Sequence, residues 1–335
     1  MKLFQSIFSG RETRDRYPES LIEMAIERAV DGTDSRLRLL SGYRKRLRAP
    51  VIQAIDHVIA LVDALPAPLL ASARNHGAEP CLAAVFSSAG DMLDLLGRGP
   101  TLRGFLASPE GNGAEQVTAL LMTERVERNI LGLDLVGEQV RRDVPQIAVS
   151  FTGHRLLDPT TSEMESRRLW KRRAFDHLLT LALGRIAEAR TERADLTRQR
   201  DLLRRKLKAL ERGGWSFEPP EDGVTEPAAL VADLEAITAQ LETLGANQDL
   251  LRSHLGIVVD LLAEAPGQIW PEPLTLILDP MNIQRAPDDP TARHLEFQEL
   301  RNVHGRRVVA LPLTIRPADL PEREDLVSAA SRYLQ

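Results

Sequence analysis

The sequence predicts a mainly helical α+β fold: an N-terminal helical bundle, a small antiparallel sheet, and a long antiparallel coiled-coil hairpin inserted between strands. Three observations predict it. Aromatic residues make up only 4% of the chain, and a core poor in aromatics but rich in Leu and Ala is typical of packed helices. A two-residue apolar period appears near residue 143 and again after residue 270. Between these segments, apolar residues follow heptad spacing.

Residues 1–142 are expected to form the bundle, with roughly five or six helices. The clearest helix covers about residues 35–65, where Asp34 or Ser35 caps the start and prolines end it. Its apolar stripe consists of Leu37, Leu40, Tyr43, Leu47, Val51, Ile55, Val58 and Leu61. Shorter helices are expected over residues 80–96, 100–107 and 113–142, separated by turns rich in glycine and proline.

Residues 143–157 and 268–335 are expected to form the antiparallel sheet, together with a C-terminal helix. Residues 144–154 alternate apolar and polar side chains, which is the pattern of a half-buried strand. Similar runs occupy residues 273–279, 294–301 and 306–316. The last two are joined by Asn302–Gly305, a turn sequence in which the glycine can adopt a positive φ.

Residues 158–267 are expected to form the coiled-coil hairpin. A capping-box pattern, Thr160 with Glu163 or Ser162 with Glu165, starts a helix of about 50 residues and roughly 75 Å. A second helix starts with Pro227 in its first turn, and a short loop requires the two helices to run antiparallel. The heptad positions of the second helix are Leu230, Leu234, Ile237, Leu241, Leu244, Leu251, Leu255, Val258 and Leu262.

Charge supports this pairing of the two helices. Residues 167–212 contain 15 Lys or Arg and 6 Asp or Glu, which is a net charge of +9. Residues 218–264 contain 10 Asp or Glu and one Arg, which is a net charge of −9. Opposite charges along the flanks favour the pairing of unlike helices and disfavour the pairing of two identical ones.

A basic cluster at the start of the long helix is a candidate partner-binding site. It consists of Arg167, Arg168, Trp170, Lys171, Arg172 and Arg173. These side chains could bind nucleic-acid phosphates or an acidic protein, or they could form a solvated face that packs through Trp170. A second basic group lies at residues 36–48, and nucleic-acid binding would gain support if the two groups were neighbours.

His154 and His304 are the candidate ligand or metal residues, because both are expected at one end of the sheet, near Asp158 and Glu299. The competing interpretation is that each is an isolated surface or core histidine. No metal-binding or phosphate-binding motif is recognisable, so no metal and no cofactor is expected. Cys81 is the single cysteine, which excludes an internal disulfide.

These observations favour a non-catalytic cytoplasmic interaction or scaffold protein that uses a projecting coiled-coil arm, with other proteins as partners and a homodimer among the options. One alternative is a nucleic-acid-associated protein that binds through arginine-rich helices. Another is an enzyme or ligand-binding protein with a site near the sheet end. No transmembrane segment is expected, and residues 1–10 could make at most a weak peripheral membrane contact.

Overall fold

The computed structural model describes residues 17–136, 139–211, 227–243 and 247–321. They form two compact units, which we name the helical unit and the sheet unit. The helical unit draws its residues from Met1–Asp56 and Phe175–Ala265, and the sheet unit from His57–Ala174 and Pro266–Gln335. Two helices, α2 (Tyr43–Asp63) and α7 (Glu163–Glu211), contribute to both units. The predicted α+β class is confirmed.

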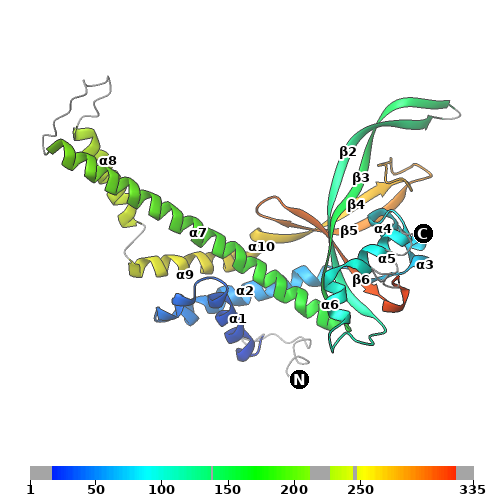
Figure 1. Cartoon of the computed structure of the whole chain (residues 1–335), viewed down its shortest axis with the longest axis horizontal. Coiled ribbons are helices and arrows are strands. Elements are labelled where there is room, and N and C mark those ends of the chain that lie inside the picture. Colours follow the sequence, from blue (N-terminus) through cyan, green and yellow to red (C-terminus); the bar gives the residue numbers. More distant parts are fainter. Residues whose placement is uncertain (1–16, 137–138, 212–226, 244–246, 322–335) are drawn as a thin grey trace, which may run out of the picture. The chain divides into compact units, whose positions relative to one another are not determined.

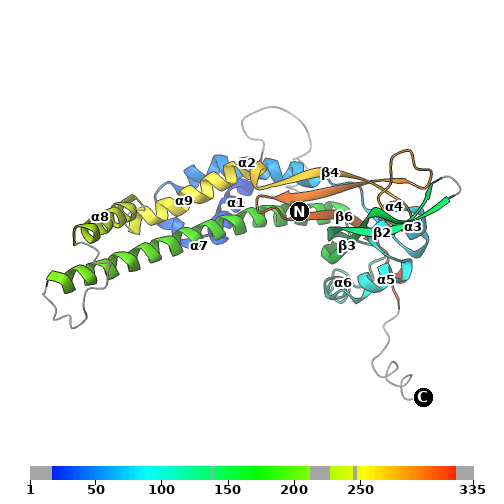
Figure 2. The same cartoon turned by 90° about the horizontal axis from the view of Figure 1, so that it is seen from above.

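The helical unit contains α1 (Glu19–Asp31), the 3-10 helix η2 (Ser35–Leu39), the first part of α2, most of α7, α8 (Pro227–Thr243) and α9 (Asn247–Ala263). The short α10 (Ala265–Gln268) follows α9. The helices bury aliphatic side chains from every segment, among them Ile26, Val30, Leu37, Leu47, Val51, Leu178, Ile186, Leu255 and Val258. Both views place α8 beside the C-terminal part of α7 (Figure 1, Figure 2).

The helix expected over residues 35–65 is divided in two. Asp34 caps η2 as predicted, since its side chain accepts a hydrogen bond from the Arg36 backbone N–H. Gly42 then adopts a φ of 76°, a left-handed conformation that ends one helical segment and allows α2 to start at Tyr43. The apolar stripe is still buried on both sides of this break, as the burial of Leu37 and Leu47 shows.

The described residues of the sheet unit form six strands and several short helices. The strands are β1 (Leu69–Ala71), β2 (Val117–Val136), β3 (Gln139–Thr160), β4 (Ile269–Leu278), β5 (Arg293–Asn302) and β6 (Arg307–Ile315). The short helices are α3 (Ala73–Ala78), α4 (Pro80–Val85), α5 (Ala89–Arg98), α6 (Pro100–Leu106) and η3 (Pro317–Asp319). The sheet order is β3-β2-β6-β5-β4 with antiparallel pairing, and β1 adds to β6 in parallel.

Residues 282–285 connect the two edges of this sheet. The Val149 N–H donates to the Asn282 carbonyl on the β3 side, at 2.9 Å. The Arg285 N–H donates to the Ile277 carbonyl on the β4 side, also at 2.9 Å. Because one short segment bonds both outer strands, the sheet curves around an apolar interior.

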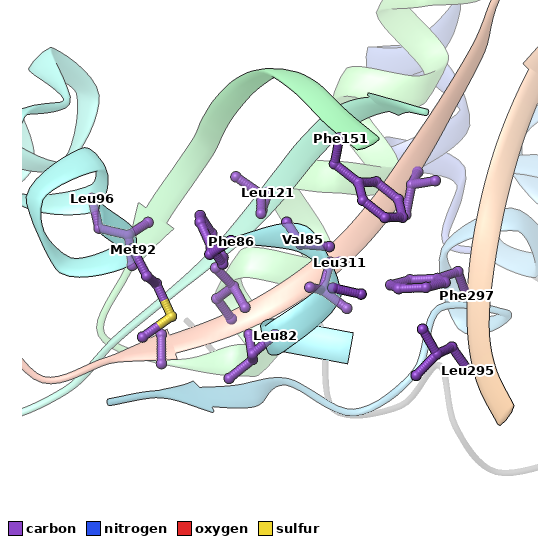
Figure 3. Close-up of a cluster of buried hydrophobic side chains, with 14 of the residues drawn as sticks. Leu82, Val85, Phe86, Met92, Leu96, Leu121, Phe151, Leu295, Phe297 and Leu311 are labelled. Carbon is purple, nitrogen blue, oxygen red and sulfur yellow. The ribbon is translucent and has the colours of Figure 1, made fainter. Parts of the chain in front are cut away.

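The interior of the sheet unit is filled from α4 and α5 on one side and from the strands on the other (Figure 3). Phe151 of β3 and Phe297 of β5 meet there with ring centroids 5.4 Å apart. The labelled residues are Leu82, Val85, Phe86, Met92, Leu96, Leu121, Phe151, Leu295, Phe297 and Leu311. This core fixes the short helices against the concave face of the sheet.

The prediction of a helix over residues 113–142 is wrong, because the chain forms β2 and the start of β3 there. The period of two is hidden in the first half of β2, where residues 117–121 are all buried and therefore all apolar or small. In the second half, Glu124 and Arg128 have the i,i+4 spacing of a helical ion pair. Pairing with β3 and β6 overrides that local preference.

Several other elements expected from the sequence are present in the structure. The three later strands are confirmed as β4, β5 and β6, with Gly305 at a φ of 75° in the turn between the last two. The long helix is confirmed as α7, and Pro227 is the first residue of α8. The predicted C-terminal helix and residues 1–10 lie largely or wholly outside the described residues. Among the described helices, none has both the length and the apolar character needed to cross a bilayer.

Candidate functional site

The C-terminal part of α7 and the neighbouring α8 form the first candidate surface, which we name the helical hairpin (residues 187–211 and 227–243). Ile186 is the last fully buried residue of α7 for which burial is known. From Ala187 to Lys208, every side chain of α7 is at least partly exposed. The heptad leucines Leu196, Leu203 and Leu207 are only half-buried. On α8, Leu230 is buried, and its heptad successors Leu234, Ile237 and Leu241 are half-buried.

The outer surface of the helical hairpin offers both apolar and acidic groups. Leu202 of α7 and Val231 of α8 are exposed. One largely exposed face of α7 carries Ala187, Glu188, Thr191, Glu192, Asp195, Leu196 and Gln199. Three carboxylates beside small apolar side chains on this face would suit a partner helix with basic flanks.

The predicted partner-binding cluster lies at the start of α7 in the sheet unit, and most of its side chains bind within the protein. The Arg167 guanidinium donates to the carbonyls of Val62 at 3.0 Å and Pro66 at 2.9 Å, and it lies over the buried ring of Trp170. Lys171 lies 2.9 Å from Asp63. Arg167 and Lys171 therefore bind the C-terminal end of α2, where carbonyls and the helix dipole favour cations.

The remaining members of the cluster are closer to solvent. Arg168 pairs with Glu165, and Arg173 with Asp158, whereas Arg172 is exposed and makes no polar contact within the described residues. Four members of the second basic group also pair with carboxylates: Arg36 with Asp34, Arg38 and Arg44 with Glu27, and Arg48 with Glu19. These pairs reduce the charge that either group could present to phosphates.

Changing Arg167 to methionine is expected to lower the free energy of unfolding of the sheet unit by about 1–3 kcal/mol. The methionine stem still packs beside Trp170, but the carbonyls of Val62 and Pro66 lose their charged donor. The matched control is Arg168→Met, because the Arg168 guanidinium is exposed and pairs with Glu165 at the surface, so its loss should cost less than about 1 kcal/mol. Urea unfolding followed by tryptophan fluorescence measures both, and equal losses would contradict the capping role of Arg167.

A buried group of polar side chains joins three segments of the helical unit. Asp34 at the start of η2 is almost completely buried, and His254 of α9 has no exposed surface. His254 Nδ1 lies 2.9 Å from Asp34 Oδ2, and Arg190 of α7 reaches the same oxygen at 2.5 Å. Since a carboxylate only accepts, Nδ1 donates, and His254 Nε2 is buried without a hydrogen-bond partner in the described structure.

The surroundings of His254 disfavour protonation of its ring. Burial, aided by the guanidinium groups of Arg190 and Arg36, holds the pKa of His254 below its usual 6.5. Hydrogen bonds from Arg36 and His254 hold the pKa of Asp34 well below its usual 3.8. An aspartate that orients a neutral histidine also occurs in catalytic triads, but no nucleophile contacts Nε2 among the described residues. The observed contacts make this group a link between η2, α7 and α9.

Acidification from about pH 7.5 to 5.5 is expected to lower the free energy of unfolding partly through His254. Its pKa in the folded state is lower than in the unfolded state, so the unfolded state takes up the proton first and is favoured as pH falls. His254→Asn keeps a donor near Asp34 but cannot titrate, so the pH dependence should become shallower. Leu39→Asn changes an exposed, non-titrating residue of the same unit, so this control should leave the slope unchanged. Unfolding midpoints across this pH range provide the measurement.

The two histidines proposed as a ligand pair are separated by the sheet. His154 of β3 contacts the Val85 carbonyl at 3.2 Å through Nε2 and stacks on Phe86, with ring centroids 5.3 Å apart. His304 is exposed in the β5–β6 turn. Strand β2 lies between β3 and β6, the strand that begins after this turn, and neighbouring strands are about 4.8 Å apart. The sequence placed both residues at strand ends, but it could not show which edge of the sheet each one occupies.

Metal binding and nucleophilic chemistry have no further support in the part of the chain that the structure describes. No group of three or more His, Cys, Asp or Glu residues is arranged to hold a metal ion there. Burial raises the pKa of the Cys81 thiol, which disfavours the reactive thiolate. Sequence reasoning identified Asp34 only as a helix cap, because its contacts with Arg190 and His254 join residues that are far apart in the chain.

Comparisons were made with known protein families, with curated protein sequences and with solved structures. None of these comparisons found a match to the chain.

Proposed function

We propose that the protein is a non-catalytic interaction or scaffold protein that binds other proteins through the helical hairpin, a coiled-coil arm formed by α7 and α8. One observation carries the proposal: α7 continues from Ala187 to Glu211 after its last fully buried residue. These 25 residues correspond to about 37 Å of helix at 1.5 Å per residue. A helix of this length that is not buried in a core provides reach and a long binding edge.

The antiparallel pairing of α7 with α8 is part of the proposal. Its support is the match between heptad position and partial burial at Leu203 and Leu207 on α7 and at Leu234 and Ile237 on α8. The opposite net charges of the two sequence segments favour this pairing over the pairing of identical helices. Zero-length crosslinks from Lys206 or Lys208 to Asp233 or Glu235, unchanged on tenfold dilution, would support an intramolecular hairpin. Loss of these crosslinks on dilution would contradict it.

No specific observation supports either alternative function, nucleic-acid binding or a ligand or enzyme site at the sheet end. The basic side chains that would bind nucleic acid are largely paired with carboxylates or carbonyls of the protein itself. The two histidines that would form a site at the sheet end lie on β3 and in the β5–β6 turn, with strand β2 between β3 and β6. We therefore propose protein binding as the main activity.

The proposal can be tested with the full-length chain. Leu202→Glu combined with Val231→Glu changes two exposed apolar side chains of the helical hairpin. Met24→Glu combined with Leu39→Glu is the matched control, because both residues are exposed in the same unit but outside the hairpin. Partners isolated from native cells should bind the control normally and the hairpin variant at least about tenfold more weakly. Equal binding by both variants would overturn the proposal.

A further inference from the structure

The β2–β3 hairpin continues beyond the rest of the sheet. Strand β6 pairs with β2 only as far as Thr123, which lies opposite Val309. From Glu124 to Val136, β2 pairs with β3 alone. We name residues 124–136 of β2 and 139–152 of β3 the β-arm; Figure 1 shows it extending past the other strands of the sheet unit. The β-arm therefore has a backbone edge on β2 that no other described strand uses.

The two edges of the β-arm differ in how well they are protected from pairing. The outer edge of β3 contains Pro145, a left-handed Asp143 with a φ of 57°, and the hydrogen bonds from residues 282–284. Proline, irregular backbone, charged side chains and covering segments are the features that prevent strands from pairing at an edge. The β2 edge is charged at positions 124, 125, 127 and 128, but between Asn129 and Leu133 it has no proline, no charged residue and no left-handed backbone. In this stretch the Leu133 carbonyl accepts a hydrogen bond from the Gln146 side chain at 3.0 Å.

The unprotected edge also carries exposed apolar side chains. Ile130, Leu131 and Leu133 are 38%, 70% and 62% exposed. Leu131 and Leu133 lie on one face of the strand, because side chains alternate with a period of two. An unpaired edge with apolar side chains is a surface suited to strand addition.

We propose that this β2 edge pairs antiparallel with the β2 edge of a second copy of the chain, with the two-fold axis at Leu131. In this register Leu131 lies opposite Leu131 of the second copy, and Leu133 lies opposite Asn129. The exposed leucines of both chains then share one face of a four-stranded ribbon. This interface is independent of the helical hairpin and does not rest on the function proposed for it.

Charge and length both favour this register. It places Arg128 opposite position 134 of the second copy, which is an aspartate, so the two-fold axis creates two positions of opposite charge. It pairs residues 126–136 of one chain with residues 136–126 of the other. The pairing therefore ends three residues beyond Thr123, where β6 already occupies the edge. Moving the axis to Ile130 would place Arg128 opposite Gly132 and remove the charge match.

The oligomeric state tests whether the edge is used. We expect the full-length protein to sediment as a dimer, and Leu131→Glu combined with Leu133→Glu to convert it to a monomer. Met164→Glu combined with Met281→Glu is the matched control, since both methionines are exposed in the sheet unit outside the β-arm, and this variant should remain dimeric. A monomeric wild-type chain at about 100 μM, or a dimer that survives the leucine changes, would overturn the proposal.

Disulfide crosslinking tests the register. In a Cys81→Ser background, Leu131→Cys places each thiol opposite its own copy, where paired Cα atoms about 4.5–5.5 Å apart allow a disulfide. Arg128→Cys is the control: its copy lies six residues along the ribbon, roughly 20 Å away. We expect an oxidised dimer only with cysteine at position 131. Equal crosslinking at both positions, or none at either, would overturn the register.

A charge exchange tests the pairing of positions 128 and 134. Arg128→Asp places like charges opposite one another and should weaken the dimer by about tenfold or more. Adding Asp134→Arg to this variant restores opposite charges and should recover the wild-type dissociation constant to within about threefold. A double variant that dimerises no better than Arg128→Asp alone would contradict the proposed register.

Discussion

Replacing Phe86 by alanine is expected to lower the free energy of unfolding of the sheet unit by about 3–5 kcal/mol, the usual cost of removing a buried phenylalanine. Phe86 is 1% exposed in the core between the short helices and the sheet (Figure 3). Its ring also stacks on His154, whose Nε2 contacts the Val85 carbonyl. The substitution therefore leaves a cavity and removes the ring contact between His154 of β3 and the residue that follows α4.

Urea unfolding followed by tryptophan fluorescence in a Trp215→Phe background measures this loss, since the other two tryptophans, Trp170 and Trp270, belong to the sheet unit. Met281→Ala is the control: this side chain is exposed in the same unit, and its loss should change stability by less than about 0.5 kcal/mol. A loss of less than about 1 kcal/mol for Phe86→Ala would show that the short helices do not pack on the sheet as described.

Replacing Asp34 by alanine is expected to lower the free energy of unfolding of the helical unit by about 2–4 kcal/mol. Loss of the cap of η2 costs about 1 kcal/mol. His254 Nδ1 loses its acceptor in a buried position, which costs about 1–3 kcal/mol. Arg36 and Arg190 add little, because both guanidinium groups are partly exposed and can return to water.

Circular dichroism at increasing urea concentration measures the loss of helix in this experiment. Asp31→Ala is the matched control, because Asp31 is an exposed carboxylate in the same region whose ion pair with Arg38 should contribute less than about 1 kcal/mol. If the two aspartates proved equally important, Asp34 would not be the residue that links η2 to α7 and α9.

Elements with strong local signals were predictable. The helix α7 has a capping pattern at its start, no proline along its length and heptad apolar spacing. The strands β5 and β6 have alternating side chains and a glycine at the turn position that requires a positive φ. In each case the residues that determine the structure are near neighbours in the chain, so their spacing carries the information.

Elements that depend on distant partners were not predictable. Strand β2 contains the i,i+4 charge spacing of a helix, and only its pairing with β3 and β6 makes it extended. The same limit applies to the candidate sites. The Asp34–His254 contact spans 220 residues, and nothing in the local pattern around either residue indicates the other.

The sequence by itself determined the α+β class, the long helix, the later strands and the unlike charges of the two helical segments. The tertiary structure decided that residues 117–136 form a strand, that Arg167 and Lys171 bind the end of α2, and that part of the β2 edge pairs with no other described strand. The physical reason is the range of the interactions. Helix caps, turns and heptads are set by residues a few positions apart, whereas strand pairing and burial depend on contacts between distant segments.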